Sequence, residues 1–329
     1  MEQDRRAFLV TTALASAALA AGTTAATAPA AAQAGGMAKG FTFCTLRSSS
    51  GYGLGVRTPR GILDVVAAEE ALRENAPTTI TQVLAGERDI NGLRRLMEKA
   101  TDRHFVAIDK AAFGPCVTHP EKILCIGLNY RKHIAEMNAQ VPAHPVLFNK
   151  FNTALNYDGG VIAVSKEDAK SFDYEAELVI VIGRTARNVS EGDALGYVFG
   201  YCTGNDFTAR DLQRRSSQWM IGKSLDGSGP IGPWLVTADL VDGDKLKIEC
   251  KVNGQVRQSS NTADMVFSCS KLVSYISNYM TLKPGDIIFT GTPEGVIAGY
   301  PKDKQAWLKP GDKVVTSIEK LGDLSFTLT

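Results

Sequence analysis

Two glutamates separated by one residue stand at the start of an apolar run. Glu175 and Glu177 lead into the aliphatic residues 178–182. If this run is a strand, positions i and i+2 project from the same face, so the two carboxylates point the same way. Two like charges beside a buried segment are unfavourable unless a cation or hydrogen-bond donors neutralise them.

A third carboxylate extends this pattern. Asp206 follows a second apolar run at residues 197–201 and a Gly204-Asn205 break. Three oxygen ligands with no Cys or His nearby suit Mg²⁺ or Mn²⁺, with Ca²⁺ possible, rather than zinc. The sequence therefore predicts a divalent-metal site formed by Glu175, Glu177 and Asp206.

A histidine and a glutamate supply a potential general base. His133 and Glu136 follow a buried-type strand at residues 123–128, in a segment with helical character. Residues three apart on a helix can touch, and a carboxylate beside a His fixes its tautomer and raises its basicity. The alternative is a solvated surface ion pair.

Further polar residues lie close to these motifs in the sequence. Arg210 and Gln213 fall on the side of the helix that Asp206 begins. The Gly/Pro-rich segment 222–234 is expected to hold Lys223 inward; the alternative is an ordinary surface lysine. Thr292, in a turn at the end of a strand, could reach a ligand. Nucleotide binding at Gly222-Lys223-Ser224 is rejected, because a P-loop needs a Gly five residues earlier and a strand leading in.

The elements that must position these residues are mostly short strands. Residues 41–66 predict a small antiparallel sheet, 67–75 and 91–104 helices, and 246–257 a hairpin. His104 and His119 are expected at the surface. An amphipathic helix is expected over residues 263–280. The many strands and few helices predict a β-rich α+β protein, with a small N-terminal module at 35–119 and a catalytic domain at 120–329.

Composition narrows the class of protein. The chain has 329 residues, of which 44% are hydrophobic, and a formal net charge of +1. Such a balance gives no support for a nucleic-acid or membrane-surface partner. The six cysteines are scattered singly without a CxxC motif, which favours buried free thiols.

The N-terminus has the pattern of an export signal. A twin-arginine motif at Arg5-Arg6 precedes an Ala/Thr-rich stretch and the small-residue site Ala32-Gln33-Ala34. This order predicts a twin-arginine signal peptide at residues 1–34 and a periplasmic protein. If translation starts at Met37 instead, the protein is cytoplasmic.

Taken together, the motifs resemble the fumarylacetoacetate hydrolase family. The segments that carry the resemblance occur in the family's order: Gly127–Tyr130 with His133 and Glu136, Asp173–Leu178, Asn205–Gln213, Lys223–Trp234, Pro284–Ile288 and Gly291–Val296. The resemblance implies a mixed β-sandwich roll, a homodimer, and one Mg²⁺ or Mn²⁺ in each site.

The resemblance also implies a role for each candidate residue. Glu175, Glu177 and Asp206 correspond to metal ligands, and His133 and Glu136 to a catalytic dyad on a mobile lid. Lys223 corresponds to a catalytic residue that contacts substrate. The substrate contacts implied are Arg210, Gln213 and Thr292.

The residues and the resemblance point to the chemistry of 2-oxo acids. The expected reaction is hydrolysis of a carbon–carbon bond in an acylpyruvate-like 2,4-dioxo acid through a metal-stabilised enolate, with His133 and Glu136 activating water. Decarboxylation or isomerisation of a 2-oxo acid or diacid needs the same enolate and is the alternative. A third reading is a non-catalytic, metal-stabilised periplasmic protein.

Overall fold

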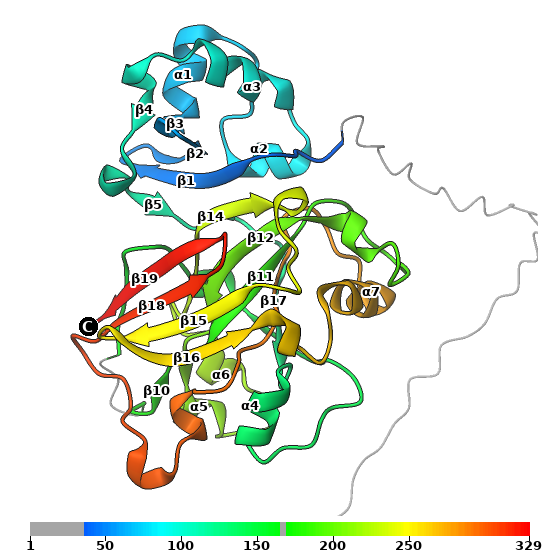
Figure 1. Ribbon diagram of the computed structural model, residues 1–329, viewed down its shortest axis with the longest axis vertical. Helices are drawn as coiled ribbons and strands as arrows, with labels where there is room; N and C mark the ends of the chain where they lie inside the picture. The colour runs from blue at the N-terminus through cyan, green and yellow to red at the C-terminus, as the bar shows by residue number, and fades with distance from the viewer. Residues whose placement is uncertain (1–35, 165–168) are drawn as a thin grey trace, which may run out of the picture. The chain divides into compact units, whose positions relative to one another are not determined.

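The computed structural model describes residues 36–164 and 169–329 (Figure 1). The signal peptide predicted at 1–34 lies outside the described residues. Within those residues, no helix combines the length and the apolar character needed to cross a bilayer.

The first described elements are short strands and helices. They are β1 (Thr42–Ser48), β2 (Gly51–Thr58), β3 (Gly61–Asp64), α1 (Val65–Leu72), α2 (Ile80–Ala85), α3 (Ile90–Lys99), β4 (Phe105–Val106) and β5 (Phe113–Gly114). Strands β1, β2 and β3 pair antiparallel in sequence order, as predicted for residues 41–66, and β4 adds to β3. Their sheet continues beyond them, because β1 also pairs with β14 (Gly229–Thr237).

The larger of the main sheets has 12 strands, drawn from most of the described sequence. Its strand order is β4-β3-β2-β1-β14-β12-β11-β17-β6-β7, with β5 paired to β1 and β8 paired to β14. The strands not yet given are β6 (Ile123–Gly127), β7 (Val146–Lys150), β8 (Leu155–Asn156), β11 (Ala176–Ile182), β12 (Val198–Asn205) and β17 (Ile287–Phe289). Most pairs are antiparallel, whereas β17 pairs parallel with β6, so the sheet is mixed.

A second sheet covers part of the first. Its order is β16-β15-β18-β19-β9, formed by β9 (Gly160–Ile162), β15 (Lys247–Val252), β16 (Gln255–Asn261), β18 (Lys313–Ile318) and β19 (Gly322–Leu328). Its members β15, β18 and β19 contact β11, β12 and β14 (Figure 1). A short pair is made by β10 (Phe172–Asp173) and β13 (Thr208–Ala209). The result is a β-rich, mixed sandwich, which confirms the predicted fold class.

Helices in this part of the chain are few and mostly short. They are α4 (Arg131–Glu136), α5 (Arg210–Gln213), α6 (Met220–Lys223) and α7 (Cys269–Tyr279). Helix α7 is shorter than the predicted 263–280, because Ser268 caps its N-terminus by accepting a hydrogen bond from the Lys271 amide. Residues Thr262–Asp264 form a separate 3₁₀ turn.

Strand β11 is buried along its whole length. Leu178 and Ile180 belong to one hydrophobic cluster, whereas Val179 and Val181 belong to another. A strand buried on both faces reads as a continuous apolar run rather than an alternating one. Side chains at positions of odd number share a face, so Glu175 and Glu177 continue the row begun by Val179 and Val181.

Two histidine predictions have different outcomes. His119 is exposed, as expected. The prediction for His104 was wrong, since its side chain is buried. Its Nδ1 accepts a hydrogen bond from the Thr101 amide at 3.1 Å and so caps a 3₁₀ turn. All six cysteines are buried and free, as predicted.

Candidate active site

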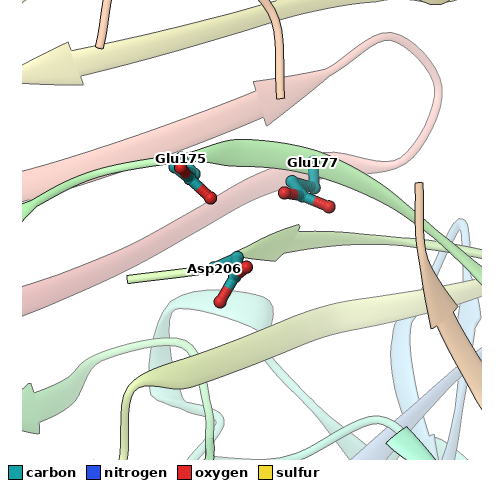
Figure 2. A group of neighbouring side chains, drawn as sticks. All are labelled: Glu175, Glu177 and Asp206. Atoms are coloured by element: carbon teal, nitrogen blue, oxygen red, sulfur yellow. The ribbon is translucent and has the colours of Figure 1, made fainter. Parts of the chain in front are cut away.

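The three predicted carboxylates meet where β11 and β12 pair. Opposite residues in this ladder include Glu177 and Gly204, and Asp206 follows the last residue of β12. One ligand oxygen from each of Glu175, Glu177 and Asp206 lies within 4.8 Å of the others, and all three residues are buried. Figure 2 shows Glu177 on β11, Glu175 on the same chain segment directly before that strand, and Asp206 on the neighbouring chain segment. The i, i+2 spacing therefore produces the predicted cluster.

Two lysine ammonium groups contact this cluster. Lys223 Nζ lies 2.6 Å from Glu175 Oε2 and 2.7 Å from Asp206 Oδ2. Lys150 Nζ lies 2.7 Å from Asp206 Oδ1 and also donates to the Lys223 carbonyl oxygen. Both lysines are buried. Lys223 thus points inward, as predicted, but its first partners are the carboxylates.

Arg210 joins the cluster to a fourth carboxylate. Its Nε donates to Asp173 Oδ2 at 2.8 Å. Its Nη2 lies 2.7 Å from Glu175 Oε1 as an ion pair, although it lacks the alignment of a hydrogen bond. Asp173 in turn accepts from the Ile297 amide at 2.8 Å. The Gln213 side-chain oxygen accepts a hydrogen bond from Arg210 Nη1 at 3.2 Å. The side chains of Arg210 and Gln213, both predicted to contact substrate, are therefore held in place by each other and by the carboxylates.

The charges of this network do not balance. Four buried carboxylates (Asp173, Glu175, Glu177 and Asp206) face three buried cations (Lys150, Arg210 and Lys223), which leaves one negative charge uncompensated. Glu177 is the carboxylate with no ion-pair partner in the described part of the chain, and it accepts only from the Gly291 amide, at 2.7 Å. A desolvated carboxylate in this position is costly.

Burial and the neighbouring charges also shift the pKa values of Glu177, Glu175 and Lys223. Burial, with the negative charges of Asp206 and Glu175, raises the pKa of Glu177 well above its usual range. Burial also opposes ionisation of Glu175, but Lys223 and Arg210 outweigh it and lower the pKa of Glu175 to about 2. Burial disfavours the charged form of Lys223, yet Asp206 and Glu175 raise the pKa of Lys223 above its usual value.

The donor set fits a divalent cation. Oxygen ligands alone suit a hard ion such as Mg²⁺ or Mn²⁺, and a bound cation would offset the negative charge that Glu177 carries when it is ionised. The Lys223 ammonium already lies between Glu175 and Asp206. This position therefore accepts a cation.

Helix α4 brings the predicted base to the same region. His133 Nδ1 lies 3.1 Å from Glu136 Oε2. The other carboxylate oxygen of Glu136 accepts from the Gly295 amide at 2.9 Å, which fixes the orientation of the carboxylate. Because Nδ1 faces Glu136, Nε2 is the ring nitrogen available for proton transfer. His133 is buried, so the pair is not a solvated surface ion pair.

A cavity of about 350 Å³ connects the base to the carboxylates. Its polar wall consists of His133, Glu175, Glu177, Arg210, Gln213, Arg214, Ser216, Lys223 and Thr292. Its apolar wall includes Ile126, Leu128, Met137, Phe148 and Trp219. Thr292 is held by Gln258, whose Nε2 donates to the Thr292 hydroxyl at 2.8 Å. Of the nine predicted site residues, seven line the cavity, and Asp206 completes the carboxylate triad. The ninth, Glu136, contacts the Nδ1 side of His133.

The sequence reasoning missed two charged residues of the site. Lys150 is the last residue of the apolar strand β7, and a single cation at the end of such a strand is a signal for a buried partner. Asp173 lies two residues before Glu175, so it shares the spacing that singled out the two glutamates. Neither signal identifies the partner without the fold.

The fold and the site define a class of protein with a β-sandwich and a buried carboxylate triad at the ends of two central strands. The family described as fumarylacetoacetate (FAA) hydrolase C-terminal matches residues 122–329. The chain belongs to the fumarylacetoacetate hydrolase family, as its motifs predicted, and this is a family of enzymes.

Individual relatives differ in the reaction that they are named for. The chain is 39% identical over 267 residues to the mitochondrial oxaloacetate tautomerase of Rattus norvegicus, covering 80% of this chain and 82% of that one. It resembles the solved fumarylacetoacetate hydrolase of Exiguobacterium antarcticum, with a TM-score of 0.73, 31% identity and coverage of 88% and 99%. It also resembles fumarylpyruvate hydrolase from Pseudomonas aeruginosa, solved with Mn²⁺ and pyruvate, with a TM-score of 0.58, 32% identity and coverage of 66% and 91%.

Proposed function

We propose that the protein is a divalent-metal-dependent tautomerase that interconverts the keto and enol forms of oxaloacetate or a similar 2-oxo dicarboxylic acid. The observation that carries the proposal is the single cavity shared by an oriented base, His133, and the carboxylate triad. The rat relative is named for this reaction. We therefore propose tautomerisation as the first candidate reaction, in place of the hydrolysis that the sequence analysis favoured.

The metal would be held by Glu175, Glu177 and Asp206. Mg²⁺ or Mn²⁺ fits these oxygen ligands, and Ca²⁺ has the same ligand preference. When bound, the ion supplies a Lewis acid that polarises the 2-oxo group of the substrate. The solved relative from Pseudomonas aeruginosa contains Mn²⁺, which supports this choice.

Proton transfer is assigned to His133. Its Nε2 accepts a proton from C3 of the keto form. The electron pair of that C–H bond forms the C2–C3 double bond, and the π electron pair of the carbonyl moves onto the C2 oxygen. Glu136 stabilises the imidazolium that results, since its carboxylate lies 3.1 Å from Nδ1. The C2 oxygen then takes up a proton from water to give the enol, and the imidazolium of His133 releases its proton to the solvent. A positioned base of this kind contributes about 10²- to 10⁴-fold in rate.

Cationic groups of the cavity would bind the anionic substrate. The raised pKa of Lys223 keeps its side chain charged at neutral pH, so it can donate to an oxygen that gains negative charge. Arg210 Nη2 lacks a well-aligned acceptor and lines the same cavity. It is the donor assigned to the substrate's first carboxylate, with Gln213 and Thr292 beside it.

Hydrolysis of an acylpyruvate is the second candidate. The same His133 could deprotonate a water that attacks the distal carbonyl, and the Pseudomonas aeruginosa relative is named as a hydrolase of this type. Decarboxylation of a 2-oxo diacid would use the same site. All three reactions pass through an enolate, so they differ in products rather than in the residues required.

Product analysis separates the candidates. The purified protein is mixed with the enol form of oxaloacetate in Mg²⁺ or Mn²⁺, and enol absorbance and mass are followed together, with a chelated sample alongside. Tautomerisation speeds the loss of enol with no change in mass, decarboxylation releases CO₂, and hydrolysis of an acylpyruvate adds water and splits the chain. An unchanged enol decay rate with either metal would refute the tautomerase proposal.

We further propose export to the periplasm and a homodimer. The twin-arginine pattern supports the first and the family resemblance supports the second. Mass spectrometry of the mature N-terminus decides the first, because a chain that begins at Gly35 indicates export and one that begins at Met37 or Ala38 excludes it. Light scattering at micromolar concentration decides the second.

A further inference from the structure

Among the described residues, one cation on the wall of the active-site cavity has no hydrogen-bond or ion-pair partner. The ionisable residues on its wall are His133, Glu175, Glu177, Arg210, Arg214 and Lys223. Arg210 and Lys223 are bound to carboxylates, and His133 is bound to Glu136. Arg214 is exposed, and its side chain makes no hydrogen bond or ion pair within residues 36–164 and 169–329.

The backbone that carries Arg214 is held firmly against the site. Arg214 caps α5, and its amide donates to the Arg210 carbonyl oxygen at 3.2 Å. Helix α6 packs closely on α5 at Gly222, where a Cβ would lie 2.4 Å from the Gln213 nitrogen. The position of the Arg214 backbone beside the cavity therefore follows from the fold of the α5–α6 segment.

Trp219, the residue directly before α6, also lines the cavity. Its ring packs on Phe148 with centroids 5.4 Å apart. It also covers Gly127, where a Cβ would lie 2.6 Å from the ring. The cavity wall near these residues is apolar, so a charged substrate group placed there would lose hydration without compensation unless a cation were present.

We propose that Arg214 binds the second carboxylate of the substrate and selects 2-oxo dicarboxylic acids over 2-oxo monocarboxylic acids. This inference rests on the proposed function, because it assumes that the 2-oxo acid end lies at the carboxylate triad. A guanidinium can bind a carboxylate through two parallel hydrogen bonds. Arg214 is the described cavity cation that is free to do so.

The test compares two substrates that differ at the distal group. Oxaloacetate has a carboxylate there, and acetylpyruvate has a neutral acetyl group. Arg214→Gln should lower kcat/KM for oxaloacetate about 10- to 100-fold, as expected for loss of hydrogen bonds to a charged group. Turnover of acetylpyruvate should change less than about threefold, and Arg214→Lys should restore part of the oxaloacetate activity.

Arg215→Gln is the matched control. It removes an equal charge from the adjacent residue, which is not on the cavity wall. A general electrostatic effect on anion attraction would make the two variants equal, and that result would overturn the proposal. An equal loss on both substrates with Arg214→Gln would also overturn it while leaving the tautomerase function intact.

Binding gives a readout that does not depend on turnover. Calorimetric titration in Mn²⁺ compares 2-oxoglutarate with 2-oxopentanoate, which differ only in the distal carboxylate. Arg214→Gln should weaken the dicarboxylate about 10-fold or more and leave the monocarboxylate unchanged. If the wild-type protein turns over neither substrate, the proposed function fails, and this titration still decides the role of Arg214. Equal affinities in wild type and variant would contradict it.

Discussion

The two halves of the candidate active site are held in different ways. Glu177 lies on β11, Glu175 directly precedes that strand, and Asp206 directly follows β12. Strand β11 pairs with both β12 and β17, and β11 and β12 are buried throughout. His133, the proposed base, lies on α4, a helix of 6 residues. The polar contacts of α4 with other described segments are short-range side-chain and amide contacts. Arg131 donates to the Asp264 and Met265 carbonyl oxygens at 2.9 and 2.6 Å. The Lys132 amide donates to Asp264, Lys132 Nζ lies 3.7 Å from Glu294, and Glu136 accepts from the Gly295 amide.

This difference assigns different physical tasks to the halves. Converging like charges must be held against their own repulsion, which requires a backbone that cannot relax. A helix of so few residues has little stability of its own and depends on its contacts. Such segments open locally at a lower free-energy cost than central strands. We therefore propose that the carboxylate half is rigid and that the half carrying His133 separates from it to admit substrate.

The largest expected effect comes from the rigid half. Glu177→Gln keeps the shape of the side chain but removes the charge that has no protein partner. Metal stabilisation is worth several kcal/mol, so the variant should lose about 1,000-fold or more in metal-dependent rate. Calorimetric titration with Mn²⁺ should show binding lost as well. Glu249→Gln, which alters a partly exposed glutamate on β15, is the control and should bind Mn²⁺ normally.

Asp206→Asn should cost stability in addition to metal binding. Asp206 is in contact with both Lys150 and Lys223, so its replacement leaves two buried ammonium groups with weaker partners. Breaking a buried pair costs about 3–5 kcal/mol, whereas Glu177→Gln breaks no ion pair. Chemical denaturation without metal measures the difference. Equal unfolding free energies for the two variants would show that the lysines are not balanced by Asp206.

The movable half should affect rate without affecting metal. His133→Ala removes the proposed base, and kcat should fall about 10²- to 10⁴-fold. Affinity for Mn²⁺ should stay within about twofold, because His133 contributes no ligand to the triad. His119→Ala, at an exposed histidine outside the cavity, is the matched control. Near wild-type turnover in His133→Ala would remove the base from the mechanism.

The part of the site that could be predicted from the sequence is the part encoded by local spacing. Glu175 and Glu177 share a face because strands have a period of two residues, and His133 reaches Glu136 because helix neighbours are three apart. The β-rich fold follows from short apolar runs and their turns. Each of these signals lies within a few residues of chain.

Contacts between distant segments could not be predicted in this way. Lys150 and Asp206 are 56 positions apart, and only the sheet order brings their strands to one site. His104 was misassigned to the surface because its partner is a backbone amide, which no side-chain pattern reports. The shortening of α7 relative to 263–280 similarly depends on one serine cap.

The smallest expected effect tests whether the base half moves alone. Asp264 Oδ2 accepts a hydrogen bond from the Lys132 amide at 3.1 Å, at the start of α4. Asp264→Ala removes this attachment, which is worth about 0.5–1.5 kcal/mol, so opening of α4 should become about 2- to 10-fold more frequent. Hydrogen exchange followed by mass spectrometry should show faster exchange at residues 131–137 and unchanged exchange in β11 and β12. Faster exchange in both regions would mean that the two halves open as one cooperative unit, and the contrast between a rigid and a movable half would then be wrong.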